Sequence, residues 1–160
     1  MAVGSTGGVV TGAGADGAEG VAGAAGSALV AAAELGIEVE TGPEVLAGST
    51  RLKAGTAQKL VLNLISTAVM VRLGRTYGNL MVDVRAGNAK LRERARRIVV
   101  DITGTDEETA RRALAATDGE AKAAVLVVLT GLDAQAATRL LTAADGHLRA
   151  ALTLAREATY

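Results

Sequence analysis

The sequence predicts a mainly α-helical chain with one or two short strands. Apolar residues recur at the helical period over most of residues 50–160, whereas strand-like alternation is confined to short segments such as "IEVE" at 37–40. The apolar residues, 49% of the chain, are mostly Ala, Val and Leu, and Phe and Trp are absent. Such a composition suits small helices that pack closely, and 160 residues suffice for one modest domain.

The charge balance and the residue inventory exclude several classes of function. The 17 basic and 17 acidic side chains cancel, so attraction to nucleic acid or to an acidic membrane surface is not predicted. Cysteine is absent and His147 is the one histidine, which excludes a thiolate metal site, a histidine metal cluster and a Ser–His triad within one chain. No stretch reaches the roughly 18 uninterrupted apolar residues of a membrane span, and "MAVGSTGGVV" lacks the features of a signal peptide. We therefore expect a cytoplasmic protein without a metal, a membrane or a nucleic-acid partner.

Residues 1–27 are expected to form a flexible Gly/Ala-rich leader. Glycine recurs there without a helical or strand period, so ordering the segment would bury little surface and lose much backbone entropy. "GSTGG" and "GAGADG" suggest a phosphate-binding loop, but neither fits GxxxxGK[ST]. Residues 27–36 then predict a short helix that ends at Gly36, before the strand at 37–40.

The segment at 42–59, "GPEVLAGSTRLKAGTAQK", predicts a loop that enters a helix. Pro43 disfavours helical angles at Gly42, and Ser49 or Thr50 is a suitable N-cap. Apolar residues then follow the helical period up to Gly74, which is expected to end the helix. This pattern predicts a core helix with a wide buried face.

Two cations lie at the predicted start of that helix, where the helix dipole is already positive. Arg51 and Lys53 are unfavourable there, whereas an anion would be stabilised by both charges, by the free backbone N–H groups and by the hydroxyls of Ser49 and Thr50. Phosphate, sulfate and carboxylate all fit this description. The alternative is that Glu44 pairs with one of the two cations and that no ligand binds, and local spacing leaves both interpretations open.

The remaining chain predicts a connection, a basic helix and a helical tail. The connection contains an extended piece at "LMVDV", and the arginines of the helix in "NAKLRERARRIVVDITG" are expected to be solvated. Residues 105–160 repeat at an offset of 27, with the pattern D-x3-A-x-R-x-L-x3-D-G-x2-[KR]-A-A-[VL] starting at Asp106 and Asp133. Each copy predicts helix, Asp-Gly turn and helix, so the two copies are expected to form a small four-helix unit. His147 follows the second turn and is expected to be a surface or cap residue.

The segment at 42–59 resembles the signature of the bacterial N-acetylmuramic acid 6-phosphate etherases and of the related glucokinase regulatory protein. "LVLNLISTAVMVRLGRTYGNLMVDVRAGNAKLRERARRIV" and the Ala-rich tail extend the resemblance from about Ser27 to the C-terminus. The resemblance favours the etherases, because the regulatory protein has a second sugar-isomerase-type domain for which 160 residues leave no room.

The resemblance implies a domain organisation and a partner. Residues 28–104 would be the C-terminal portion of an α/β sugar-isomerase (SIS) domain, and residues 105–160 a small helical domain of two repeats. The ligand would be a sugar 6-phosphate, no cofactor would be needed, and a homo-oligomer is expected because the family's site is completed at a subunit interface. Glu44, Ser49, Thr50, Arg51 and Lys53 would lie near the ligand. Glu44 would assist proton transfer or orient a hydroxyl, and Arg51 would contact the ligand or lock the loop.

The sequence also departs from the family pattern. In the etherases the Ser-rich phosphate loop and two catalytic carboxylates lie upstream of "GPE", and residues 1–41 contain no counterpart. We therefore expect an incomplete etherase that is inactive alone, in which the apolar face of the helix after Thr50 needs another partner. The alternatives are a non-catalytic module that binds sugar phosphate and a helical domain that binds protein.

Overall fold

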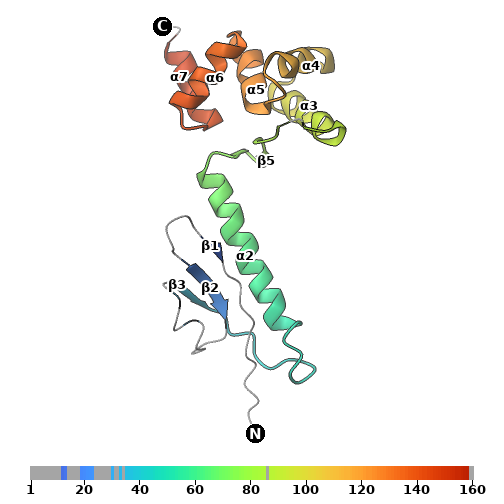
Figure 1. The fold of residues 1–160 in the computed structure, drawn as a ribbon, viewed down its shortest axis with the longest axis vertical. Coiled ribbons are helices and arrows are strands. Elements are labelled where there is room, and N and C mark those ends of the chain that lie inside the picture. Colours follow the sequence, from blue (N-terminus) through green and yellow to red (C-terminus); the bar gives the residue numbers. More distant parts are fainter. Residues whose placement is uncertain are drawn as a thin grey trace. The chain divides into compact units, whose positions relative to one another are not determined.

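The computed structural model describes residues 12–13, 19–23, 30, 33, 35–85 and 87–158. Helices predominate in this part of the chain and the strands are short, so the predicted mainly α-helical class is confirmed (Figure 1). The chain divides into two compact units, Met1–Ala68 and Val69–Tyr160. This division falls inside one helix, whereas the domain boundaries expected from the sequence lie at residues 27 and 104.

The first unit contains a three-stranded sheet. Strands β1 (Gly12–Ala13), β2 (Glu19–Gly23) and β3 (Leu35–Glu38) lie in that order, with β1 antiparallel and β3 parallel to β2. No regular element was expected within residues 1–27, so β1 and β2 were not predicted. Most of the helix expected over 27–36 lies outside the described residues.

The predicted strand at 37–40 is observed two residues earlier, as β3. The prediction that Gly36 ends a helix is wrong, because Gly36 lies within this strand. A Cβ at this position would come within 2.5 Å of Val30 Cγ1. The glycine therefore permits a close approach between two segments rather than a helix end.

Helix α2 (Lys53–Arg72) follows the loop, and its end was predicted correctly. Gly74 has φ +64°, and the N–H of Arg75 donates to the carbonyl of Met70 at 3.0 Å. This left-handed glycine with a bond reaching back five residues satisfies carbonyls at the helix end.

The predicted buried face of α2 is not observed, whereas the expectation that this face needs another partner agrees with its exposure. None of the residues of α2, all of which the structure describes, is buried. The apolar period was read correctly as a helix, but no described element covers the helix. By length and hydropathy alone α2 also passes as a membrane-spanning helix, as does the core helix of many soluble proteins.

The second unit is built around helix α5 (Ala121–Thr130). Residues 121–126 of α5 are buried, and the helix contacts α3 (Ala89–Thr103), α4 (Glu107–Ala116), α6 (Ala134–Ala143) and α7 (Leu148–Glu157). A hairpin of β4 (Thr76–Tyr77) and β5 (Leu80–Met81) precedes these helices. The fully buried Val82 then anchors the exit of the hairpin in the core.

The pairs α4–α5 and α6–α7 share their backbone geometry at positions 27 residues apart. Asp106 and Asp133 cap the first helix of each pair, and each carboxylate accepts the N–H three residues on, at 2.9 and 2.7 Å. Asp118 and Asp145 both have φ 50°, and each is followed by a glycine with φ 76° or 74°. The helices and Asp-Gly turns predicted for residues 105–160 are thus present, and His147 occupies the N-cap position of α7.

Candidate functional site

The loop before α2 brings the predicted site residues together at the start of the helix. Gly42 and Gly48 have φ +66° and +82°, and a Cβ on either would meet no atom within 4 Å, so the left-handed backbone itself calls for glycine. The N–H of Ser49 donates to Leu46 O at 3.0 Å, and the N–H of Leu52 donates to Ser49 O at 3.2 Å. These turns carry the chain into α2.

Glu44 supplies the negative charge at the N-terminus of α2. Its Oε2 accepts the N–H of Lys53 and its Oε1 accepts the N–H of Ala54, both at 3.0 Å. The hydrogen bond from Ala54, followed by that from Lys53, holds the pKa of Glu44 below its usual value. The carboxylate therefore occupies the helix terminus that the sequence assigned to an anion.

The position of Glu44 differs from the pairing with a cationic side chain that the sequence allowed, and binding of a ligand at this helix start stays a prediction. Its main bonds run to backbone N–H groups rather than to a cationic side chain. The ammonium of Lys53 instead donates to the carbonyl of Pro43 at 2.9 Å. Ser49 and Thr50 are not the cap, because α2 begins at Lys53 and a carboxylate nine residues upstream satisfies its first N–H groups. That separation is why local spacing did not reveal the bond.

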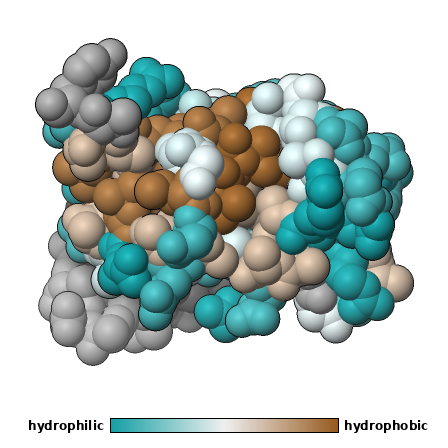
Figure 2. Space-filling model, turned by 90° about the horizontal axis from the view of Figure 1, so that it is seen from above, coloured by the Kyte–Doolittle hydropathy of each residue, from teal (hydrophilic) through white to brown (hydrophobic). Residues whose placement is uncertain are grey.

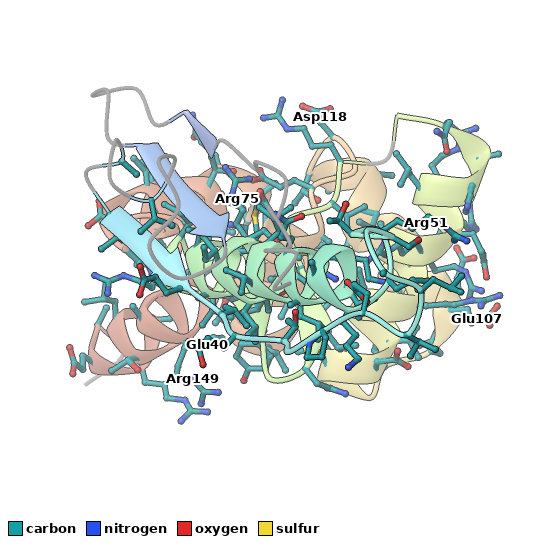
Figure 3. All side chains as sticks on the ribbon, turned by 90° about the horizontal axis from the view of Figure 1, so that it is seen from below. Glu40, Arg51, Arg75, Glu107, Asp118 and Arg149 are labelled. Carbon is teal, nitrogen blue, oxygen red and sulfur yellow. The ribbon has the colours of Figure 1, made fainter. Side chains whose placement is uncertain are left out.

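Arg51 is an exposed cation of the junction, by which we mean the loop residues 42–52 and the first turn of α2. Its side chain is exposed on the loop (labelled in Figure 3), and no described residue forms an ion pair or hydrogen bond with it. Ser49 and Thr50 are half-buried beside it. Among the described residues, no group of three His, Cys, Asp or Glu side chains could hold a metal ion. The junction thus offers an exposed positive charge and two half-buried hydroxyls to a polar or anionic ligand.

The second unit holds a buried cation that sequence reasoning missed. Lys122 is 6% exposed, its Nζ donates to Gly146 O at 2.9 Å, and it lies 3.2 Å from Asp83 Oδ1. Desolvation lowers the pKa of Lys122. Asp83 also accepts from Arg75, which Figure 3 labels. The carboxylate and the carbonyl explain how a lysine is accommodated in an apolar core.

The equivalent position of the second helix pair contacts the hairpin itself. Arg149, 27 residues after Lys122, lies 5.1 Å from the centre of the Tyr77 ring. The shared [KR] of the sequence pattern could have signalled this role. At both positions the cation attaches the segment after α2 to the helices.

The imidazole of His147 contacts the C-terminal end of α2. Its Nε2 lies 3.1 Å from the carbonyl of Arg72, and its Nδ1 lies 3.1 Å from the carbonyl of Asp145. A Cβ on Gly74 would come within 2.7 Å of the imidazole. Gly74 therefore serves both the helix end and the approach of the ring.

A groove between α3 and α4 has a volume of about 740 Å³ and mixed charge. Arg96 pairs with Glu93 and with Glu107, both at 2.6 Å, and the bonds to Arg96 and Arg97 lower the pKa of Glu93 to about 2. Arg96 is thus engaged within the protein rather than freely solvated. The groove carries no excess of positive charge for an anion.

Comparison with known proteins shows which enzymes this chain is similar to. No protein-family profile matches the chain. Over 98 residues, 61% of this chain, it is 70% identical to the N-acetylmuramic acid 6-phosphate etherase of Streptomyces coelicolor, of which the match covers 32%. The protein of the same name from Rubrobacter xylanophilus is 71% identical over 90 residues, 56% of this chain and 30% of that protein. That of Deinococcus radiodurans is 57% identical over 98 residues, 61% of this chain and 32% of that protein.

These matches confirm the resemblance inferred from the sequence, over up to 98 residues rather than the whole range from about Ser27 to the C-terminus. The chain spans about a third of the length of the curated relatives that it matches. A match of 98 residues leaves 62 of the 160 residues unmatched, so it includes residues 63–98 wherever it begins. The second half of α2, the hairpin and most of α3 are therefore etherase-like sequence.

Proposed function

We propose that this chain carries the C-terminal part of an N-acetylmuramic acid 6-phosphate etherase. The observation that supports the proposal most strongly is the 70% identity to the Streptomyces coelicolor etherase over 98 residues. The complete enzyme would cleave the lactyl ether of its substrate and give N-acetylglucosamine 6-phosphate and D-lactate. This reaction would serve the recycling of cell-wall sugars.

The chemistry would require groups that we do not find in this chain. Elimination of the ether followed by addition of water needs carboxylates that act as acid and base, and the resemblance places these upstream of Gly42. Glu44 is poorly suited to the role, because both of its oxygens accept backbone N–H groups and its pKa is lowered. We therefore propose that the chain is inactive alone.

Sugar phosphate would contact the junction through Arg51. The ammonium of Lys53 is bonded to Pro43 O, and Glu44 already neutralises the N-terminus of α2, which leaves the guanidinium as the group that can approach an anion. The half-buried hydroxyls of Ser49 and Thr50 would add polar contacts. Glu44 would act by holding the loop rather than by touching the reacting atoms.

The assignments of the domains, of the cellular location and of the oligomeric state are part of the same proposal. Residues 28–104 would belong to an SIS-type domain, and the two helix pairs of residues 105–160 would form a small repeat domain. The protein would be cytoplasmic and would form a homo-oligomer. The shared geometry of the Asp118 and Asp145 turns supports the repeat.

A reconstitution assay tests the catalytic proposal. The chain is incubated with N-acetylmuramic acid 6-phosphate alone, and then with the part of the Streptomyces coelicolor relative that lies outside the matched 98 residues. We expect no D-lactate from the chain alone and release of D-lactate from the mixture. D-lactate from the chain alone would contradict the proposed inactivity, and an inactive mixture would contradict the etherase assignment.

A non-catalytic module that binds sugar phosphate is the second candidate. It is favoured by the junction itself, where the Glu44 carboxylate is engaged by backbone N–H groups and Arg51 has no partner among the described residues. Binding of N-acetylglucosamine 6-phosphate should raise the melting temperature, and Arg51→Ala should abolish the shift. Arg94→Ala, at an exposed position of α3, is the control. A chain that is indifferent to every sugar phosphate would leave the helical protein-binding domain as the interpretation.

A further inference from the structure

We propose that α2 is a docking surface for the part of an etherase that lies outside these 160 residues. The inference rests on the proposed function and names the partner that the fold requires. Six large apolar side chains of α2 and its C-terminal flank are between 43% and 71% exposed: Leu60, Leu64, Ile65, Val69, Val71 and Leu73. Contiguous apolar surface of this kind marks an interaction site.

The exposed side chains lie on two opposite faces of the helix. At 100° per residue, Leu60, Leu64 and Val71 share one face, and Ile65, Val69 and Leu73 lie nearly opposite. A single helix packed against α2 would cover one of these faces and leave the other in water. The occupant must therefore enclose α2, as the rest of a larger domain would.

The charges of α2 argue against a second copy of this chain. The helix contains Lys53, Lys59 and Arg72 but no acidic residue, so self-pairing would juxtapose cations near the helix ends. A complementary surface would present an apolar centre and carboxylates at its rim. The homo-oligomer of the proposed function would then form through a different surface.

The same charges argue against a membrane. The uncharged run from Leu60 to Val71 extends about 18 Å at 1.5 Å per residue. A bilayer core is about 30 Å thick, so the uncharged run is shorter than a typical membrane span. The short uncharged run therefore favours a protein surface over lipid as the occupant.

The relatives identify the occupant. Residues 63–98 lie inside the match to the Streptomyces coelicolor etherase, and that protein has about two-thirds of its length outside the match. The helix that corresponds to the second half of α2 would be covered there by this additional sequence. The occupant is therefore the remaining etherase sequence, whichever polypeptide supplies it.

Binding between the full chain and the remaining part of the Streptomyces coelicolor relative tests the inference. We expect the two polypeptides to co-elute in equimolar amounts in size-exclusion chromatography with light scattering, whichever oligomeric state the chain has alone. Leu64→Lys and Val71→Lys, on one face of α2, should each weaken the complex at least about tenfold. Leu129→Lys, the same kind of change at an exposed leucine of α5, should leave the affinity within about twofold.

Each other outcome would overturn the inference. Absence of a complex, or a complex that both α2 variants leave intact, would place the partner elsewhere. Self-association lost in Leu64→Lys would make a second copy the occupant, and α2-dependent binding to phosphatidylglycerol vesicles would make it a membrane. A complex that forms as expected but releases no D-lactate would overturn the proposed reaction and leave the docking surface standing.

Discussion

Helices α2 and α5 are both rich in aliphatic residues, yet their surroundings differ completely. Residues 121–126 of α5 are buried by four neighbouring helices, whereas none of the residues of α2, all described, is buried. At its C-terminal end α5 emerges from the core, and Leu129 is exposed. Figure 2 shows one face of the molecule on which apolar side chains gather within a hydrophilic border. An apolar period specifies a helix, but burial depends on neighbours that the period does not describe.

Truncation of one leucine in each helix should show the largest difference. Leu126 is fully buried, and Leu126→Ala should lower the free energy of unfolding by about 2–5 kcal/mol. Leu64 is exposed, and Leu64→Ala should change it by less than about 0.5 kcal/mol in the chain alone. Urea unfolding followed by circular dichroism measures both. Equal losses would show that α2 is already covered in the isolated chain.

The connection between α2 and the second unit can be tested at two glycines. Gly74 and Gly78 have similar positive φ, but only at Gly74 would a Cβ meet the imidazole of His147. Gly78→Ala should cost about 1 kcal/mol for the left-handed backbone, and Gly74→Ala should cost about 1–2 kcal/mol more because the ring must move. Equal losses in thermal unfolding would show that the His147 contact contributes nothing.

The equivalent cations of the two helix pairs should differ in importance. Lys122→Ala would leave Asp83 and Gly146 O without a buried donor and should cost about 1–3 kcal/mol. Arg149→Ala removes an exposed contact with Tyr77 and should cost about 0.5–1 kcal/mol. Denaturant titration of both variants provides the comparison. A larger loss for Arg149→Ala would contradict the expectation that the buried contacts of Lys122 contribute more than the exposed contact of Arg149.

The cap of α2 should respond to acid. Because the folded pKa of Glu44 is lowered, its stabilisation is present above the ordinary carboxyl pKa and is lost as the pH falls through the folded value. Carbon NMR titration of Glu44 should place its midpoint below the ordinary value of a glutamate carboxyl group. Glu44→Gln should remove the acid dependence of α2 N-terminal order. An unshifted midpoint would mean that the carboxylate does not cap the helix.

Local signals accounted for much of the fold. Gly74 as a helix end, Asp106 and Asp133 as caps, and the Asp-Gly turn at Asp118 were all predictable, because each depends on residues a few positions away. The resemblance of the segment at 42–59 to the etherases also needed only sequence.

Longer-range contacts could not be predicted in this way. Glu44 reaches an N–H nine residues downstream, and Lys122 reaches a carbonyl 24 residues away, so neither bond has a local signature. The pairing of β1 and β2 depends on a Gly-rich segment without an apolar period. The exposure of α2 depends on a surface that the described residues do not supply.

Hydrogen exchange at the backbone amides of Leu60 to Val71 tests the central claim most directly. The chain is measured alone and after addition of the remaining part of the Streptomyces coelicolor relative. Our account predicts weak protection of these amides in the chain alone and at least about tenfold slower exchange in the mixture. Strong protection in the chain alone, unchanged by the addition, would contradict it.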